Sequence, residues 1–389
     1  MAHFLLLSAM FILVSCSAQN HADRSAHASF VDSGTNTDHS ATAALPAQIT
    51  ASRETAITRS VQRCQAAIVG VNVLAVRSVI RSLVPREFQD LFPAPWFGFR
   101  DWMEVESVGS GFLISEDGYI LTNAHVVENA TKVVITMTDG TKHQAEIVGV
   151  DPVTDIAVLK IDGEDLPYLE FGDSQDLLTG EWVIAFGNPF GLFAYNAKPT
   201  VTVGVISNQH LNFIIDGKVY RDMIQTDAAI SSGNSGGPLT NALGEVIGMN
   251  TFIYSTAQRG GEAGSIGIGF AIPAHRLQRI TELLIAQQKI PRPDPRRFGL
   301  QLRNLTTRLK RQLDLPEEIQ GVLITGIRRG SLADRAGLDA GDLILQIDGE
   351  PTWQTTDVYV HLLDAISGDV LRFTILRDGK RIEQTMEIP

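Results

Sequence analysis

Between Val108 and Ile272 the chain alternates short runs of β-branched and aromatic residues with glycine, asparagine and aspartate. The runs include GFLIS, KVVITM, IAVLKI, EWVIAFG and GEVIGMN. Many short strands separated by turn residues are typical of an all-β barrel or sandwich. At the end of this region, Leu277, Ile280 and Leu284 recur at helical spacing, which predicts one amphipathic helix over 274–287.

The segments on either side set the domain boundaries. A short helix is expected within 53–64, followed by a strand from Ile68 to Val73 and a long loop with aromatic residues. Three prolines predict a stiff linker over 289–297, which is the clearest boundary in the chain. The sequence therefore predicts one domain over 53–288 and a second, smaller one of mixed strands and helices over 298–389.

The first residues have the pattern of a targeting segment. The apolar run Phe4–Val14 is shorter than the roughly 20 residues that span a bilayer, and it fits a secretory signal over 1–15. The run ends in LVSC, which resembles the bacterial lipobox, so lipidation of Cys16 is expected; an ordinary cleaved signal is the alternative. Residues 16–52 are polar and predict a disordered tether. The expected location is the cell envelope, periplasmic or otherwise extracytoplasmic, with a lipid anchor in a membrane.

Charge and cysteine usage exclude two classes of function. The net charge of -12 argues against a nucleic-acid partner, which would need a basic surface. The two cysteines, Cys16 and Cys64, have no metal-ligand spacing, so no metal site is expected.

Three short segments carry the residue types of nucleophilic catalysis. They are TNAHVV around His125, DPVTDIAVL around Asp155 and GNSGGPL around Ser235. A serine nucleophile needs an imidazole to take its proton, and the imidazole needs a carboxylate that fixes its tautomer. The order His, Asp, Ser along the chain is that of chymotrypsin-type double barrels and differs from the orders of subtilisins and α/β-hydrolases.

The serine segment is the most specific of the three. Its glycines free the backbone to turn two N–H groups toward a developing oxyanion, whereas a plain tight turn is the alternative for this segment alone. The segment also fits the G-x-S-x-G elbow of α/β-hydrolases, which requires a helix after the serine and an Asp before the His downstream. Here Pro238 and a predicted strand follow, and no Asp lies between Ser235 and His275, so the elbow is excluded.

Taken together, VGSGFLIS, TNAHVV, DPVTDIAVLKI, FGNPFGL, TDAAI, GNSGGPL and GIGFAIP resemble the HtrA/Deg family of bacterial envelope serine proteases. The resemblance implies a mainly β chain, with a chymotrypsin-like double β-barrel of two six-stranded barrels followed by a C-terminal α+β PDZ domain. By position it implies that Ser235 is the nucleophile, His125 the general base and Asp155 the orienting carboxylate. It also implies an oxyanion hole formed by the N–H groups of Gly233, Ser235 and Asn234.

The resemblance also implies where substrate specificity arises. In trypsin-like folds the base of the pocket lies six residues before the nucleophile, which is Ala229 here, so cleavage after Lys or Arg is disfavoured. Ile230, Thr251 and Phe252 are expected to line the pocket and to favour small or medium apolar side chains. Such side chains are normally buried in folded proteins, so unfolded polypeptides are the expected substrates.

The C-terminal domain resembles a PDZ domain. Phe298, Gly299 and Leu300 match the loop whose backbone N–H groups capture a peptide carboxylate, and GSLADRAGL matches the core signature. A peptide C-terminus would add as a strand beside a helix expected over Asp357–Ala365; a purely structural cap is the alternative. Family members form trimers through aromatic residues in the N-terminal segment. None is present around Glu54–Arg63, so a homotrimer is expected from the resemblance alone.

The expected function is therefore an ATP-independent serine endopeptidase that degrades misfolded or unfolded envelope proteins without a cofactor. Its PDZ domain would bind peptide C-termini and regulate the activity. The alternative is a catalytically idle chaperone or adaptor that works through the PDZ groove.

Overall fold

The computed structural model describes residues 52–82, 98–188, 198–253 and 267–389. The expected signal segment, the lipidation residue Cys16 and nearly all of the tether lie outside these ranges, as does most of the long aromatic loop expected after Val73. Residues Arg53–Pro389 form one compact unit. None of the helices in the described part of the chain is long and apolar enough to cross a bilayer.

The N-terminal helix α2 (Ala56–Cys64) confirms the helix expected within 53–64. Thr55 and Thr58 form a reciprocal capping box, in which each side chain accepts a hydrogen bond from the other residue's backbone N–H, at 3.2 and 2.9 Å. Cys64 at the end of the helix is fully buried, and burial raises the pKa of its thiol. The thiol donates to the carbonyl of Gly244 at 3.3 Å, so Cys64 ties the helix to a distant loop as a packed residue.

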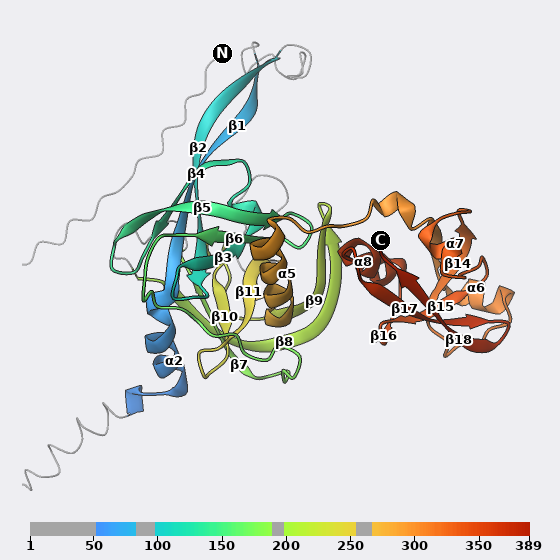
Figure 1. The fold of residues 1–389 in the computed structure, drawn as a ribbon. Coiled ribbons are helices and arrows are strands. Elements are labelled where there is room, and N and C mark those ends of the chain that lie inside the picture. Colours follow the sequence, from blue (N-terminus) through green and yellow to red (C-terminus); the bar gives the residue numbers. More distant parts are fainter. Residues whose placement is uncertain (1–51, 83–97, 189–197, 254–266) are drawn as a thin grey trace, which may run out of the picture. The chain divides into compact units, whose positions relative to one another are not determined.

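Six strands close the first barrel in the order β1-β2-β3-β6-β5-β4 (Figure 1). They are β1 (Ile68–Ser82), β2 (Gly98–Leu113), β3 (Tyr119–Asn123), β4 (Ala130–Thr136), β5 (Lys142–Asp151) and β6 (Ile156–Lys160). The expectation of a loop directly after Val73 is wrong. Instead β1 continues to Ser82 and pairs with β2 along its whole length, so hydrogen bonds between the strands satisfy this stretch of backbone.

Six further strands close the second barrel in the order β10-β11-β12-β9-β8-β7. They are β7 (Trp182–Gly187), β8 (Thr200–Ile215), β9 (Lys218–Thr226), β10 (Pro238–Thr240), β11 (Val246–Ile253) and β12 (Gly269–Pro273). Closure leaves no exposed edge among these strands, and their fully buried side chains include Phe186 on β7 and Ile247 on β11. The chymotrypsin-like double barrel is thereby confirmed.

The hairpin of β8 and β9 is a part of the second barrel that contacts a loop of the first barrel. Asp216 and Gly217 have φ of 51° and 79°, as a two-residue type I′ turn requires, and they place Lys218 opposite Ile215. The N–H of Val219 donates to the carbonyl of Val153 at 2.6 Å. This bond fastens the end of the hairpin to a loop of the first barrel.

Helix α5 (Ala274–Gln287) follows β12, which confirms the amphipathic helix expected over 274–287. Its apolar face, including Leu277, Ile280 and Leu284, is buried against strands of both barrels. The proline-containing segment then leads through a short 3₁₀ turn at Pro295–Arg297 to the C-terminal domain.

The C-terminal domain has its own core and one sheet with strand order β13-β14-β15-β17-β18, in which β16 pairs with β15. Helices α6, α7 and α8 pack around it, and α8 confirms the helix expected over 357–365. Strand β13 pairs only with β14 among the described residues, so it forms an edge of the sheet. The elements are β13 (Leu300–Asn304), α6 (Thr307–Gln312), β14 (Val322–Ile327), α7 (Leu332–Arg335), β15 (Leu343–Ile347), β16 (Glu350–Pro351), α8 (Thr355–Asp364), β17 (Val370–Arg377) and β18 (Lys380–Glu387).

Candidate active site

Strand pairing in the first barrel brings His125 and Asp155 together. His125 lies in a 3₁₀ turn (Ala124–Val126) directly after β3, and Asp155 lies directly before β6. These two strands pair in antiparallel register, with Asn123 opposite Ile156. The carbonyl of Asp155 accepts hydrogen bonds from the backbone N–H of Ala124 at 3.1 Å and from the side chain of Asn123 at 3.0 Å. The two loops are therefore locked to each other through backbone contacts.

The Asp155 carboxylate holds the His125 ring in place. Asp155 adopts a left-handed backbone conformation with φ of 62°, which aspartate tolerates better than most residues. Its Oδ1 accepts from the backbone N–H of His125 at 3.0 Å, and its Oδ2 lies 2.8 Å from the ring nitrogen Nδ1. The Asp155 side chain is fully buried, whereas the His125 side chain is 34% exposed. This geometry keeps Nδ1 on the carboxylate and leaves the other ring nitrogen for a proton transfer.

Three further side chains donate to the same carboxylate, and all come from the second barrel. The ammonium of Lys218 lies 2.7 Å from Oδ1, and the hydroxyls of Tyr220 and Thr251 lie 3.1 and 3.0 Å from Oδ2. Sequence reasoning found neither Lys218 nor Tyr220, and it assigned Thr251 to the specificity pocket. The available signal was the Asp-Gly turn, which predicts a hairpin but not what its end contacts.

The charges around Asp155 determine its protonation. Burial alone would raise the pKa of its carboxyl, but hydrogen bonds and charges from His125 and Lys218 outweigh burial and lower the pKa below its ordinary value. Burial, and next the charge of Asp155, raise the pKa of Tyr220, so its hydroxyl remains a donor. Asp155 is therefore an ionised acceptor that is surrounded by donors.

Ser235 is linked to this cluster through Thr251. The Ser235 hydroxyl donates to the Thr251 carbonyl at 2.7 Å, while the Thr251 hydroxyl donates to Asp155. The carbonyl of Ser235 accepts from the backbone N–H of Ser110 on β2 at 3.0 Å. In this conformation the Ser235 hydroxyl points to Thr251, so a rotation about its Cα–Cβ bond is needed before it can pass a proton to His125.

The turn before Ser235 is a 3₁₀ helix (Ser232–Asn234). The Asn234 N–H donates to the Ser231 carbonyl at 2.9 Å, so an oxyanion would take its donors from Gly233 and Ser235 unless this turn opens. The Gly233 carbonyl accepts from the Ser110 hydroxyl at 2.6 Å. Gly236, after Ser235, has φ of 85°, and a side chain there would clash with the Ser110 carbonyl, so only glycine fits.

The residues expected to line the specificity pocket lie around this turn. The Ala229 carbonyl accepts from the Thr202 hydroxyl at 2.8 Å and from the Asn234 side chain at 3.4 Å. Ile230 is buried against Gly269, where any side chain on residue 269 would collide with it. Phe252 continues β11, but its side chain lies outside the described part of the structure.

The residues expected to bind a peptide carboxylate lie at the start of β13. Phe298 is buried, and the Gly299 backbone is left-handed with φ of 69°. The Gly299 carbonyl accepts from the Arg328 N–H at 2.9 Å, and the Phe298 carbonyl accepts from the Ala333 N–H at 3.2 Å. Leu300 then begins the edge strand, to which a peptide could add as a further strand.

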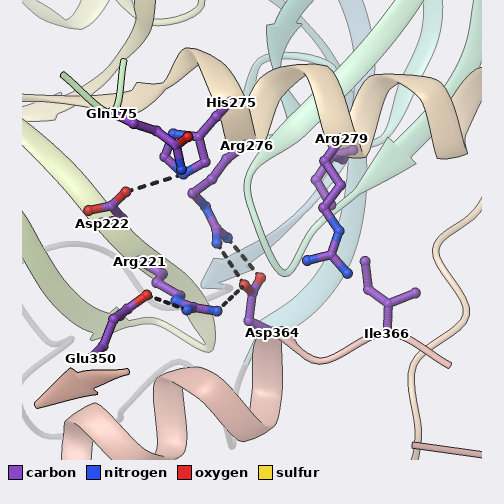
Figure 2. Close-up of a pocket in the computed structure, with 10 residues that line it drawn as sticks. Gln175, Arg221, Asp222, His275, Arg276, Arg279, Glu350, Asp364 and Ile366 are labelled. Atoms are coloured by element: carbon purple, nitrogen blue, oxygen red, sulfur yellow. Dashed lines mark hydrogen bonds and ion pairs between the residues drawn. The ribbon is translucent and has the colours of Figure 1, made fainter. Parts of the chain in front are cut away.

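A second buried carboxylate joins helix α5 to helix α8. Figure 2 shows Arg276 on α5 pointing at Asp364 at the end of α8, with two hydrogen bonds of 2.6 and 2.7 Å. Arg221 on β9 approaches the same carboxylate at 3.7 Å and binds Glu350 at 2.5 Å. A cavity of about 210 Å³ lies among these side chains. Burial would raise the pKa of Asp364, but the charge and hydrogen bonds of Arg276 outweigh burial and lower it.

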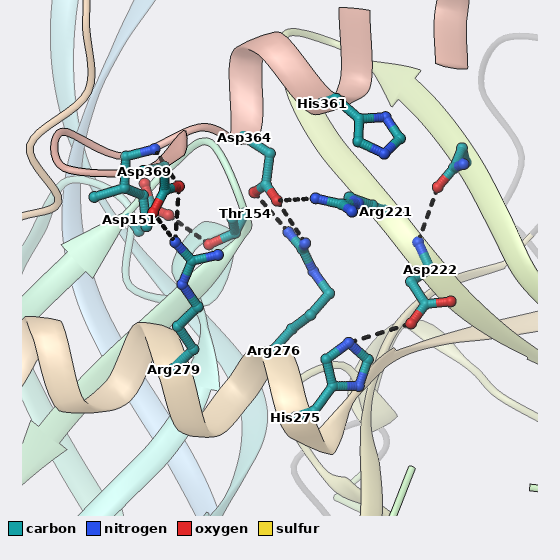
Figure 3. A network of polar contacts seen from close by, with 12 residues as sticks. Asp151, Thr154, Arg221, Asp222, His275, Arg276, Arg279, His361, Asp364 and Asp369 are labelled. Atoms are coloured by element: carbon teal, nitrogen blue, oxygen red, sulfur yellow. Dashed lines mark hydrogen bonds and ion pairs between the residues drawn. The ribbon is translucent and has the colours of Figure 1, made fainter. Parts of the chain in front are cut away.

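Ionic contacts continue on both sides of this pair (Figure 3). His275 contacts Asp222 at 3.2 Å, and Arg279 contacts Asp369 at 2.6 Å. In addition, Arg292 in the proline-containing segment binds Asp151 with two hydrogen bonds of 2.6 and 2.8 Å. In the described ranges, no group of three or more His, Cys, Asp or Glu side chains could hold a metal ion.

Two family models match the chain. A trypsin-like peptidase domain matches residues 109–249, and a PDZ domain matches residues 323–377. The first match spans the segments of His125, Asp155 and Ser235.

Curated relatives and a solved structure are similar to the chain over most of its length. A probable periplasmic serine endoprotease DegP-like from Chlamydia trachomatis is 45% identical over 277 residues, which cover 71% of this chain and 52% of the relative. A protein of the same description from Halomonas elongata is 38% identical over 311 residues, which cover 80% of this chain and 62% of the relative. The structure of the HtrA-type protease AlgW with a decapeptide superposes with a TM-score of 0.62 at 34% identity, covering 85% of this chain and 98% of that one. The chain thus spans about half of the length of the first of these relatives.

Proposed function

The chain belongs to the HtrA family of trypsin-like serine proteases with a PDZ domain, and we propose that it is an ATP-independent endopeptidase of unfolded envelope proteins. The observation that carries the proposal is the linkage of Ser235, Thr251, Asp155 and His125 by hydrogen bonds at the junction of two closed barrels. The curated relatives are described as periplasmic, which supports a location in the envelope.

In the proposed mechanism the Ser235 hydroxyl rotates from the Thr251 carbonyl toward His125 and attacks the scissile carbonyl. His125 takes the hydroxyl proton and later returns it to the leaving amine, while Asp155 fixes the ring through Nδ1. The backbone N–H groups of Gly233 and Ser235 stabilise the negative charge that develops on the carbonyl oxygen. The amine leaves while the acyl group stays on Ser235. Water then attacks this acyl-enzyme, with His125 taking the proton of the water and passing it to Ser235, which releases the acid product and restores the hydroxyl. Apart from substrate and water, every group that moves a proton or forms a bond belongs to the chain, so the reaction needs no cofactor.

The proposed substrates are polypeptides that expose apolar side chains. Ala229 at the expected base of the pocket brings no negative charge that would attract Lys or Arg. Ile230 adds an apolar wall. Because apolar side chains are accessible mainly in unfolded chains, such a pocket selects misfolded proteins.

The PDZ domain is proposed to bind peptide C-termini through Phe298, Gly299 and Leu300 and to regulate the protease. The edge position of β13 supports this role, because an added peptide strand would pair with it. The ion pair between α8 and α5 gives the domain a direct contact with the protease. A peptide with an apolar C-terminus should therefore change the turnover of a short chromogenic substrate, and deletion of residues 298–389 should remove that response.

We also propose a lipid anchor at Cys16 and a homotrimer, both on the family resemblance and the LVSC segment. Mass spectrometry of the native N-terminus should find a diacylglycerol thioether, and Cys16→Ser should release the protein from membranes. A lipid-free mature chain that begins elsewhere would contradict the anchor.

The proposed activity is tested by cleavage of unfolded casein without ATP. Ser235→Ala should abolish cleavage while leaving the thermal unfolding curve nearly unchanged. The idle-chaperone alternative would be favoured instead if wild-type protein bound casein but did not cleave it, or if the variant cleaved it at the wild-type rate.

A further inference from the structure

The β8–β9 hairpin brings a lysine to the carboxylate of the triad. Lys218 begins β9 directly after the Asp216–Gly217 turn, and its ammonium donates to Asp155 Oδ1 at 2.7 Å. The Asp155 side chain is fully buried, and that of Lys218 is 24% exposed. The serine protease mechanism needs only the serine, the imidazole, the carboxylate and the oxyanion donors. The lysine is therefore an addition to that mechanism, and its effect can be derived from its charge.

The contacts of the hairpin hold Lys218 in this place. The Val219 N–H donates to the Val153 carbonyl at 2.6 Å, two residues before Asp155. The Tyr220 hydroxyl donates to Asp155 Oδ2 at 3.1 Å, so residues 218 and 220 donate hydrogen bonds to the two oxygens of one carboxylate. Because alternate residues of a strand point to the same side, one strand supplies both donors. The ion pair is thus fixed by backbone geometry on both sides.

We propose that Lys218 is a positioning residue for the His125–Asp155 couple, and that its positive charge extends the activity of the protease toward lower pH. This inference rests on the proposed function. Lys218 already compensates the charge of Asp155, so a second positive charge on the His125 ring is less favourable than beside a carboxylate without a lysine. A reaction that needs a neutral general base should therefore persist to lower pH with Lys218 beside Asp155 than without it.

The other titratable groups around the couple do not have this effect. Tyr220 remains a neutral donor, since burial and next the charge of Asp155 raise its pKa. Glu128 lines the same cavity of about 280 Å³ as His125 and Lys218, and Asp216 lies in the hairpin turn. Both are acidic, so their charges would favour a protonated ring rather than oppose it. In the described part of the chain, Lys218 is the one lysine or arginine that forms an ion pair with Asp155.

The test is the pH dependence of inactivation by diisopropyl fluorophosphate, which requires a neutral general base and no knowledge of the natural substrate. The second-order rate constant is measured from about pH 5 to 9 for wild type and for Lys218→Met, Lys218→Gln and Lys218→Arg. The acid limb of this profile is the range in which the rate constant falls as the pH decreases. In Lys218→Met and Lys218→Gln this limb should move to higher pH by about one unit, which is the low end of the shift that a charge within about 4–6 Å produces. The rate constant at alkaline pH should be the same as that of wild type. Arg keeps the charge and should leave the limb at the wild-type position.

Lys160→Met is the matched control. The Lys160 ammonium binds the carbonyls of Asp117 and Ile161 at 2.6 and 3.0 Å, away from the triad, so its loss should leave the limb unchanged. The inference is overturned if the limb of Lys218→Gln coincides with that of wild type, or if its rate constant falls by the same factor at every pH. The side-chain amide of Lys218→Gln can still donate a hydrogen bond to Asp155, so this variant is used for the test if Lys218→Met does not fold. The proposed function fails separately if wild type does not react, or if Ser235→Ala reacts equally.

Discussion

Asp155 and Asp364 are both buried aspartates with lowered pKa values, but their partners differ. Asp364 faces Arg276 through two hydrogen bonds and Arg221 at 3.7 Å, and both partners are guanidinium groups that keep their proton at all relevant pH values. Asp155 faces one ammonium group, that of Lys218, and one imidazole ring, that of His125. Its other side-chain donors are the neutral hydroxyls of Tyr220 and Thr251.

The comparison separates two uses of a buried carboxylate. Where the partner charge is permanent, the pair can only hold two elements together, as Arg276 and Asp364 hold α5 to α8. Where the partner can change its charge, the carboxylate can stabilise a transient cation, which is the role we propose for Asp155 beside His125. Disrupting the Asp155 cluster should therefore change the reaction rate, whereas disrupting the Asp364 cluster should change the stability of the domain contact.

The largest effect is expected from Asp155→Asn. An amide cannot hold His125 in the required tautomer or stabilise its charged form, so kcat on casein should fall by about 10⁴ while the fold persists. Rates and thermal unfolding are measured together. Asp151→Asn is the matched control, since Asp151 binds Arg292 rather than a histidine and should affect stability more than rate. A loss below tenfold in Asp155→Asn would point to a different carboxylate.

A smaller effect, on stability alone, is expected from Arg276→Met. The change leaves Asp364 buried without its main partner, which costs about 3–5 kcal/mol when the charge cannot reach water. The PDZ domain can separate from α5, which exposes Asp364 to water. The loss of stability therefore cannot exceed the free energy of the contact between the PDZ domain and the protease domain. Calorimetry should show one unfolding transition of wild type becoming two. An unchanged single transition would show that the pair does not couple the two domains.

The smallest effect is expected from Arg279→Ala, one turn further along α5. The Arg279 side chain is 50% exposed and that of Asp369 is 27% exposed, so water already screens this ion pair. Such pairs contribute about 0–1 kcal/mol, and the unfolding transition should remain single. If Arg279→Ala were as disruptive as Arg276→Met, burial would not be what distinguishes the two pairs.

Local patterns in the sequence predicted many of the strands and helices and the segments of the candidate active site. Turn residues between β-rich runs predicted the barrel strands, and the spacing of Leu277, Ile280 and Leu284 predicted α5, because both signals arise within a few residues. The His125 and Asp155 segments were found in the same way, and strand pairing brings them together. The extension of β1 to Ser82 was missed, since it depends on pairing with β2 across the segment between them.

Contacts between distant segments had no such signal. Lys218 and Tyr220 lie 63 and 65 residues from Asp155, and Arg276 lies 88 residues from Asp364. Only closure of the second barrel and packing of α8 against β8 and β9 bring these groups together. The Thr251 hydroxyl points at Asp155 because of the register of β11, which the sequence of that strand does not reveal. Motifs in the sequence thus locate the proposed reacting groups, whereas the side chains that contact them from distant segments depend on the tertiary fold.

We propose above that Ser235 is a nucleophile activated by His125. The most direct measurement is covalent labelling by a fluorophosphonate, followed by intact mass and peptide mapping of the wild type, Ser235→Ala and His125→Ala. We expect a single adduct on the peptide that contains Ser235 in the wild type, no adduct in Ser235→Ala, and labelling slowed by orders of magnitude in His125→Ala. An adduct on another residue, or equal labelling of folded Ser235→Ala, would contradict it.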